Sequence, residues 1–267
     1  MTSKEFKYFI RSWSYSFTMS LHDKSHRLNS FDWNSNKVFY RSSTSDMTLI
    51  YEILLKSDKK AEYFFPIQIK PKVILDIGAN IGITSIYLAK LFPDALIYSF
   101  EPLKDNFEIL EKNIQNYKNI SAFNIALGSK NGFFKVYYSD DLENFGGASL
   151  YSSGEGNDSK SFSECEVKNI SETLDELNID SVDLIKIDTE GAEFEILSSL
   201  KGHFLQNISW ITGELHGKND FKLLDYLVNF KFSISLTKQI DSRLFMFSAG
   251  KDEIISKLSK KEKRNLF

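Results

Sequence analysis

Residues 73–102 read VILDIGANIGITSIYLAKLFPDALIYSFEP, and this stretch decides the fold. Its first apolar run, Val73–Asp76, is typical of a strand buried in a parallel sheet. A turn that contains glycines follows, and then an apolar segment of helical length, Ile83–Leu91. Pro93 ends that segment before a second apolar run, Ala95–Phe100. The order strand, helix, strand predicts a βαβ unit with parallel strands and a right-handed crossover.

The alternation of strand and helix patterns continues beyond residue 102. We predict helices over Lys104–Asn116, Ser171–Leu177, Ala192–Leu200 and Asp220–Asn229, and strands over Ile120–Leu127, Val182–Asp188, Ile208–His216, Phe232–Leu236 and Leu244–Phe247. A short polar turn separates the last two strands, which predicts a closing hairpin. Residues 129–168 interrupt the pattern with many turn formers and predict an inserted loop or hairpin, either functional or a tolerated surface insertion. The fold class is therefore α/β, with a doubly wound, mostly parallel sheet.

The two ends of the chain lie outside this alternation. Residues 1–70 contain two helical patterns, Lys4–Ser20 and Ser45–Leu55, and predict an N-terminal helical cap. Residues 251–267 are basic, and we interpret them as a tail that presents a solvated helix face. The main domain is then expected to span residues 71–250, including the insertion.

The composition limits the class of protein. Hydrophobic residues make up 42% of the 267 residues and charged residues 26%, as in ordinary globular domains. Because the formal net charge is −3, we expect no nucleic-acid partner. Cys165 is the single cysteine, and the first residues lack the pattern of a secretory signal, so we expect a cytoplasmic protein. No apolar run reaches the roughly 20 residues needed to cross a bilayer, so we expect no membrane insertion and leave a homo-oligomer open.

The turn after the first strand predicts a ligand site, because ligands bind at the carboxyl ends of the strands in open α/β sheets. It contains Asp76, Gly78, Asn80 and Gly82. A dinucleotide-binding turn would read G-x-G-x-x-G, but Asn80 and Ile83 occupy the second and third glycine positions. A carboxylate beside the turn would repel a pyrophosphate and would suit the cationic methyl donor S-adenosylmethionine.

Two residues at later strand ends predict further contacts with a nucleoside. Glu101 ends the second strand, where its carboxylate could accept hydrogen bonds from both ribose hydroxyls. Asn124, near the end of the third strand, could contact adenine, although an asparagine there can also be simple turn chemistry.

Acidic residues and a histidine follow the fourth and fifth strands. Asp188 lies at the tip of the fourth, and helix capping alone could explain Glu190 and Glu193 after it. Alternation places Glu214 and His216 on the same side of the fifth strand. We predict His216 as a general base, Asp188 as the group that orients it or the acceptor, and Glu214 as a ligand of an acceptor hydroxyl or a metal. Asp188, Glu214 and His216 could together bind a divalent metal, and the sequence leaves this open.

Three blocks of the sequence resemble the FkbM family of methyltransferases. They are residues 73–102, DLIKIDTEGAEFEIL (183–197) and ITGELHG (211–217), with FNIALGSKNG (123–132) between the first two. The resemblance implies a class I methyltransferase sheet of seven strands whose last strand is antiparallel. It also implies that S-adenosylmethionine is the cofactor, that a sugar hydroxyl is the acceptor, and that the site includes Asp76, Gly78, Asn80, Gly82, Glu101 and Asp188.

These inferences predict an O-methyltransferase that acts on a sugar or nucleotide sugar, for a bacterial surface polysaccharide or a glycosylated metabolite. Two alternatives stay open at this point. An NAD-dependent oxidoreductase would fit the same architecture, but this sequence lacks two of the glycines that the dinucleotide-binding motif requires. A noncatalytic adapter could have kept the cofactor fold and use its aromatic N-terminal segment to bind a partner. N-methylation is a third alternative, within the methyltransferase class.

Overall fold

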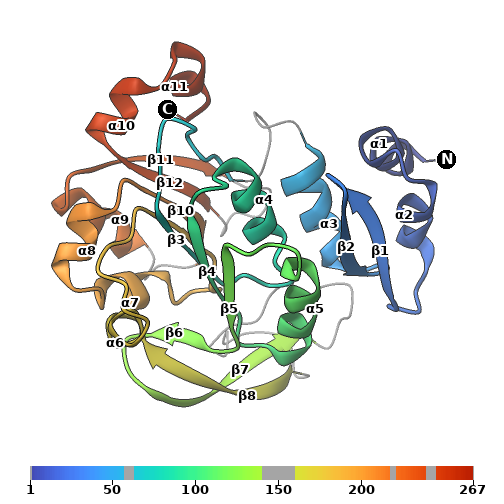
Figure 1. The fold of residues 1–267 in the computed structure, drawn as a ribbon, viewed down its shortest axis with the longest axis horizontal. Helices are drawn as coiled ribbons and strands as arrows, with labels where there is room; N and C mark the ends of the chain where they lie inside the picture. The colour runs from blue at the N-terminus through green and yellow to red at the C-terminus, as the bar shows by residue number, and fades with distance from the viewer. Residues whose placement is uncertain (1, 57–62, 140–159, 217–220, 239–244, 267) are drawn as a thin grey trace.

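A sheet of seven strands forms the centre of the computed structural model, which describes residues 2–56, 63–139, 160–216, 221–238 and 245–266 (Figure 1). From edge to edge the strands are β11 (Phe232–Lys238), β12 (Phe245–Lys251), β10 (Trp210–Leu215), β9 (Leu184–Ile187), β3 (Val73–Ile77), β4 (Leu96–Phe100) and β5 (Ile120–Phe123). Neighbouring strands from β10 to β5 are parallel, whereas β12 runs antiparallel to both β10 and β11. The predicted doubly wound sheet, with its antiparallel last strand, is confirmed.

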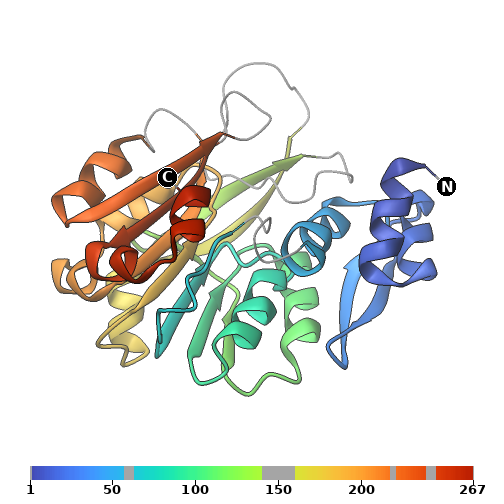
Figure 2. The ribbon, with the colours of Figure 1, turned by 90° about the horizontal axis from the view of Figure 1, so that it is seen from above.

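Helices cover both faces of this sheet (Figure 2). One face carries α4 (Ile83–Leu91) and α5 (Lys104–Ile114), and the other carries α6 (Ile170–Glu176), α7 (Glu193–Ser198), α8 (Gly202–Asn207) and α9 (Phe221–Asn229). Alternation along β3 sends Ile74 into the core on the α4 side and Leu75 into the core on the α6–α9 side. The apolar strand patterns therefore reflect burial on both faces, and the predicted bounds agree to within a few residues.

In the N-terminal segment the helical stretch predicted over Lys4–Ser20 is divided into two helices at Trp13, and a hairpin is also present. The elements of the segment are α1 (Ser3–Ser12), α2 (Tyr15–Met19), the 3-10 turn η1 (Ser20–His22), β1 (Leu28–Trp33), β2 (Asn36–Arg41), α3 (Ser45–Leu49) and the π-helical turn η2 (Ile50–Leu55). Asn34 and Ser35 connect β1 to β2 with φ angles of 48° and 65°. Asparagine tolerates this left-handed region better than most residues, which was the one sequence signal for the hairpin. The segment shares a continuous apolar core with α4, and the division of the chain at residues 70 and 250 stays a prediction.

The predicted strand Ile120–Leu127 is wrong as a single element. The chain bends at Asn124, so that β5 pairs with β4 while β6 (Ala126–Gly128) joins a separate sheet with β8 (Lys160–Asn169) and β7 (Gly132–Ser139). The bend arises because the Asn124 amide donates hydrogen bonds to two backbone carbonyls after β4, those of Glu101 and Pro102. The described part of the insertion is thus a pair of antiparallel strands. Residues 140–159, which include most of the turn-forming glycines of the insertion, lie outside the described residues.

The basic C-terminal residues form two short helices, α10 (Asp252–Lys257) and α11 (Lys260–Leu266). Ile254 and Leu258 are buried, so this end of the chain packs on the domain as well as presenting a charged face. Among the described residues, none of the helices has the length and apolar character that a membrane crossing requires.

Candidate functional site

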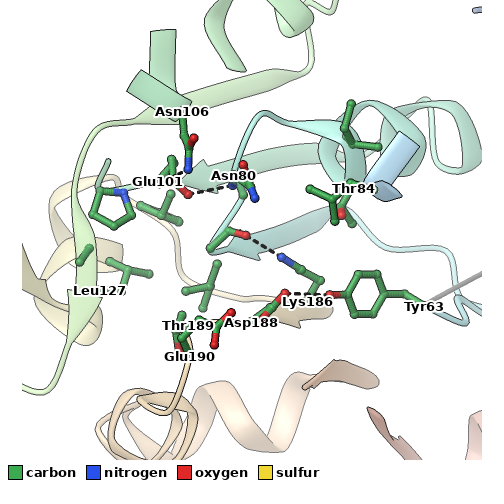
Figure 3. Close-up of a pocket in the computed structure, with 18 of the residues that line it drawn as sticks. Tyr63, Asn80, Thr84, Glu101, Asn106, Leu127, Lys186, Asp188, Thr189 and Glu190 are labelled. Carbon is green, nitrogen blue, oxygen red and sulfur yellow. Dashed lines mark hydrogen bonds between the residues drawn. The ribbon is translucent and has the colours of Figure 1, made fainter. Parts of the chain in front are cut away.

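A pocket opens at the carboxyl ends of β3, β4 and β9 (Figure 3). The space between its walls, counted out into open solvent at the mouth, is about 850 Å³. Its walls bring together the glycine turn, two later strand ends and the N-terminal segment. The polar groups that concern its chemistry are Tyr63, Asn80, Glu101, Lys186, Asp188 and Glu190.

The glycine turn is shaped by backbone packing. Gly78 has a φ of 75°, and a Cβ atom there would overlap the carbonyl oxygen of Asp188 at the end of β9. The backbone N–H groups of Gly78 and Ala79 both donate to the carbonyl of Phe100, at 3.0 Å. Gly82, with a φ of 83°, then begins α4. Glycine is required at position 78 because the turn passes directly against β9.

Asp76 is placed under this turn and does not line the pocket. It is fully buried, and its Oδ2 accepts a 2.6 Å hydrogen bond from Ser85 Oγ. The Nζ of Lys186, its register partner on β9, lies 3.4 Å from Asp76 Oδ1 and donates to the carbonyl of Gly78 at 2.6 Å. The negative charge of Asp76 is therefore paired with a buried lysine. This arrangement disfavours the predicted direct attraction between Asp76 and a donor cation.

Glu101 lines the pocket as predicted and is held by three donors. Its Oε2 accepts from the backbone N–H of Asn80 at 2.8 Å, and its Oε1 accepts from the N–H of Leu103 at 3.0 Å and from the Asn106 amide at 3.4 Å. Burial raises the pKa of Glu101 to about 7, although these hydrogen bonds and Lys186 favour the charged form. Glu101 is thus a well-oriented acceptor whose charge depends on pH near neutrality.

Asn124 is exposed and does not line the pocket. Its amide nitrogen is committed to the two carbonyls at the end of β4, at 2.9 and 3.0 Å. The alternative of simple turn chemistry describes these contacts, and the predicted contact with adenine stays untested.

His216 follows β10 and lies among four carboxylates. Its Nε2 is 3.4 Å from Glu190 Oε2, 3.4 Å from Glu214 Oε2 and 3.7 Å from Asp188 Oδ1, and its Nδ1 is 3.3 Å from Glu193 Oε1; these contacts define the carboxylate–histidine cluster. Its five residues come from three places in the fold, the ends of β9 and β10 and the start of α7. Only Asp188 and Glu190 of these five residues line the pocket.

The protonation of the cluster differs from the sequence prediction. Burial opposes a charge on His216, but the surrounding carboxylates outweigh burial and raise its pKa to about 12. Burial also raises the pKa of Glu190 to about 8, and burial together with Glu214 raises that of Asp188. A histidine that keeps its proton at neutral pH is a poor general base, so this geometry disfavours the predicted role of His216. Asp188 and Glu190, unlike His216, line the pocket in which a substrate would release its proton.

Glu193, the first residue of α7, holds the turn that precedes the helix and does not cap the helix itself. It is buried, and its carboxylate accepts hydrogen bonds from the backbone N–H groups of Thr189, at 2.7 Å, and Gly191, at 3.0 Å. Despite its burial, these bonds and His216 lower its pKa. Glu190, between Thr189 and Gly191, has a φ of 56°, an unusual value for a residue with a side chain. The turn that Glu193 holds thereby places Glu190 at the pocket wall.

Asp188, Glu193 and His216 also offer ligand atoms that all lie within 4.8 Å of one another. A carboxylate and imidazole set of this kind suits divalent metals such as Mn²⁺ or Fe²⁺. Glu193 takes the place that the sequence analysis gave to Glu214.

Three pocket residues were absent from the sequence prediction. Tyr63 donates its hydroxyl to Asp188 Oδ2 at 3.0 Å, and Lys186 and Asn106 support the turn and Glu101. The signal for Lys186 was a charged residue inside an otherwise apolar strand. Tyr63 and Asn106 carried no such signal, because their neighbours come from distant parts of the chain.

The strand order, the reversed last strand and the ligand pocket after the first strand of the sheet define the class I methyltransferase fold. A family model described as the methyltransferase FkbM domain matches residues 76–252, about two thirds of the chain. The chain belongs to this family of methyltransferases.

Individual relatives are distant and differ in length. Methyltransferase 1 of Beauveria bassiana is 26% identical over 185 residues, covering 62% of this chain and 74% of that protein. The AMB antimetabolite synthetase AmbE of Pseudomonas aeruginosa is 27% identical over 180 residues, covering 55% of this chain but 8% of that protein. Methyltransferase sdnD of Sordaria araneosa is 27% identical and covers 48% of this chain and 60% of its own length. The chain thus spans a small part of one relative and about three fifths of another.

Similar solved structures include the fibrillarin of Aeropyrum pernix with bound S-adenosyl-L-methionine. Its TM-score is 0.47 at 12% identity, and the match covers 83% of this chain and 82% of that one. A putative methyltransferase from Streptococcus mutans with bound SAH has a TM-score of 0.44 at 12% identity, over 74% of this chain and 99% of that one.

Proposed function

We propose that the protein transfers a methyl group from S-adenosylmethionine to a hydroxyl oxygen of a sugar or nucleotide sugar. The observation that carries this proposal is the pocket itself. Figure 3 shows Asn80 and Glu101 on one side of this space and Asp188 and Glu190 on the other. The glycine turn also lines it, and Gly78 packs against Asp188. A donor and a proton acceptor would therefore face each other across one cavity, as methyl transfer to a hydroxyl requires.

The residues at the donor end fit S-adenosylmethionine. Glu101 offers a fixed carboxylate for the ribose hydroxyls. The Oδ1 atom of Asn80 is buried beside it with no hydrogen-bond partner among the described residues, and could accept from a ligand donor. The turn at Gly78–Gly82 keeps its backbone close to the cavity because position 78 has no side chain. When bound, the cofactor supplies a methyl group already activated by its sulfonium.

At the acidic end, Asp188 would accept the hydroxyl proton of the substrate. It lines the pocket, and Tyr63 orients one of its oxygens through a 3.0 Å hydrogen bond. A carboxylate with a raised pKa is a stronger proton acceptor than an ordinary one. His216 would then act as a fixed positive charge that holds the carboxylates together, and Glu214 would support His216 at 3.4 Å.

A sugar acceptor is supported by the mixed lining of the pocket. Asp188 and Glu190 can accept hydrogen bonds from hydroxyl groups, while Leu49, Ile53 and Tyr63 provide apolar surface. The apolar residues come from the N-terminal segment, outside the family match. We therefore propose that this segment helps to select the acceptor.

Titration calorimetry with S-adenosylhomocysteine and with NAD tests the donor. We expect micromolar binding of the first and no heat from the second; the reverse would establish the oxidoreductase alternative. Labelled S-adenosylmethionine with a panel of nucleotide sugars then tests transfer, and amine acceptors in the same panel test N-methylation. Donor binding without product from any acceptor in the panel would favour the noncatalytic adapter.

A divalent metal bound by Asp188, Glu193 and His216 is the alternative to a positively charged His216, because an imidazole binds a metal only when it has lost its proton. The close ligand atoms of these three residues favour it. Metal analysis of the purified protein, before and after dialysis against a chelator, tests it directly. One equivalent of metal, with a fall in melting temperature on its removal, would support the site. An unchanged melting temperature and no bound metal would exclude it.

A further inference from the structure

We propose that Arg41 and Asp46, in the N-terminal segment, position Glu101 to bind the methyl donor, S-adenosylmethionine. They do so through the side chain of Asn106. This inference rests on the proposed donor site at Glu101. It assigns a task in donor binding to two residues that lie outside the family match at residues 76–252.

Arg41 and Asp46 form a buried, two-pronged ion pair. The Nε of Arg41 donates to Asp46 Oδ2 and its Nη2 donates to Asp46 Oδ1, both at 2.8 Å. The backbone N–H of Arg41 adds a third bond to the same carboxylate, at 2.8 Å. Arg41 is 8% exposed and Asp46 is fully buried. The guanidinium is therefore fixed in position and direction, since β2 holds its backbone and Asp46 holds its head.

Asn106, on α5, connects this pair to Glu101. Its Oδ1 accepts from Arg41 Nη2 at 2.8 Å, and its Nδ2 lies 3.4 Å from Glu101 Oε1. A guanidinium can only donate, so the oxygen of the amide must face Arg41. The amide nitrogen must then face Glu101. Arg41 thus decides which end of the Asn106 amide the Glu101 carboxylate meets.

The direction of that amide affects the charge on Glu101. An N–H donor stabilises the carboxylate, whereas an amide oxygen turned toward it would repel it. The other groups that bear on Glu101 are Lys186, which favours its charged form, and the thiol of Cys165, whose pKa is raised by burial and by Glu101. A carboxylate can accept from both ribose hydroxyls, whereas a protonated acid must use one oxygen as a donor. Binding of S-adenosylmethionine should therefore weaken as Glu101 becomes protonated.

The same hairpin has a second contact with the domain that avoids Glu101. The amide of Asn36 donates to the hydroxyl of Tyr117, at 3.4 Å. Tyr117→Phe removes this contact and leaves the Asn106 amide in place. It is the matched control for a general effect of loosening the N-terminal segment.

The test compares binding of S-adenosylhomocysteine to the full chain and three variants by calorimetry between pH 6 and 8.5. Asn106→Asp keeps an oxygen that accepts from Arg41, and it replaces the N–H group that faces Glu101 by a negatively charged oxygen. We expect about 10-fold weaker binding at pH 7, with most of the affinity regained at pH 8.5. Arg41→Lys keeps the charge beside Asp46 but loses the fork that reaches Asn106, and should bind about 5-fold more weakly. Tyr117→Phe should bind as the wild type does.

The outcomes are distinct. If both Asn106→Asp and Arg41→Lys kept the wild-type affinity and pH profile, the positioning of Glu101 by Arg41 and Asn106 would be overturned. The proposed donor site at Glu101 would remain intact. An equal loss in Tyr117→Phe would also overturn the positioning of Glu101, because docking of the segment would then explain the effect. Absence of binding by the wild type would overturn the proposed function itself.

Discussion

The two ends of the pocket are built in different ways. The donor end consists mainly of the turn after β3, of which residues 77–80 line the pocket, together with Glu101. The acidic end gathers side chains from β9, β10, the start of α7 and the N-terminal segment. The donor end depends on backbone shape, which tolerates no added atom at Gly78. The acidic end depends on the balance of charges among its side chains. Substitutions that change one side-chain group should therefore reveal the separate contribution of each group.

The largest effect is expected at the donor end. Gly78→Ala should abolish binding of S-adenosylhomocysteine, because the added Cβ would overlap the backbone at Asp188 and the left-handed φ disfavours a side chain. Calorimetry measures the loss. Gly202→Ala is the control, because a Cβ there meets its nearest neighbour, Phe230, at 4.0 Å. Full affinity in Gly78→Ala would show that the turn is less constrained than its packing suggests.

Asp188→Asn should separate chemistry from binding. Loss of the proton acceptor should lower turnover about 100-fold or more, with affinity for S-adenosylhomocysteine changed by less than about 3-fold. Single-turnover methyl transfer measures the first effect and calorimetry the second. Glu190→Gln, on the same wall, is the comparison. If it lost more activity than Asp188→Asn, Glu190 would be the proton acceptor.

His216→Gln should act mainly on stability. Removing the cation leaves four carboxylates around a largely buried position, which should lower the melting temperature by about 10 °C at pH 7. Calorimetric melting measures this change. If turnover of the folded variant also fell to the level of Asp188→Asn, the original prediction of His216 as the base would regain its support.

The smallest effect is expected for Tyr63→Phe. It removes one hydrogen bond to Asp188 and keeps the aromatic ring in the wall, so turnover should fall about 5-fold. The slope of the pH–rate profile should remain unchanged, since the acceptor of the proton is still present. An unchanged turnover would mean that Asp188 is oriented without Tyr63.

The same contrast explains what the sequence could predict. The alternation of strands and helices and the glycine turn follow from local patterns along residues 73–102 and 183–216, and the family resemblance implied the seven strands with an antiparallel last one. The fold class was therefore predicted correctly, and Glu101 lies at the end of the second parallel strand along the chain, where it was expected. Asp76 sits at a strand end in the sequence, but its pairing with Lys186 depends on the neighbouring strand, 110 residues away. The charge on His216 depends on four carboxylates at once, which no local pattern reveals. Tyr63 and Asn106 were missed for the same reason.

The shared core of α4 and the N-terminal segment has a practical consequence for work on this family. Residues Ile83–Ala89 of α4 are all buried, and the N-terminal segment shares their apolar core. A shortened chain that starts at residue 76, where the family match begins, would lose the first three of the five residues of β3 and expose that helix to water. We expect such a fragment to aggregate during expression, so the boundaries of sequence similarity should not be used as the boundaries for producing the protein.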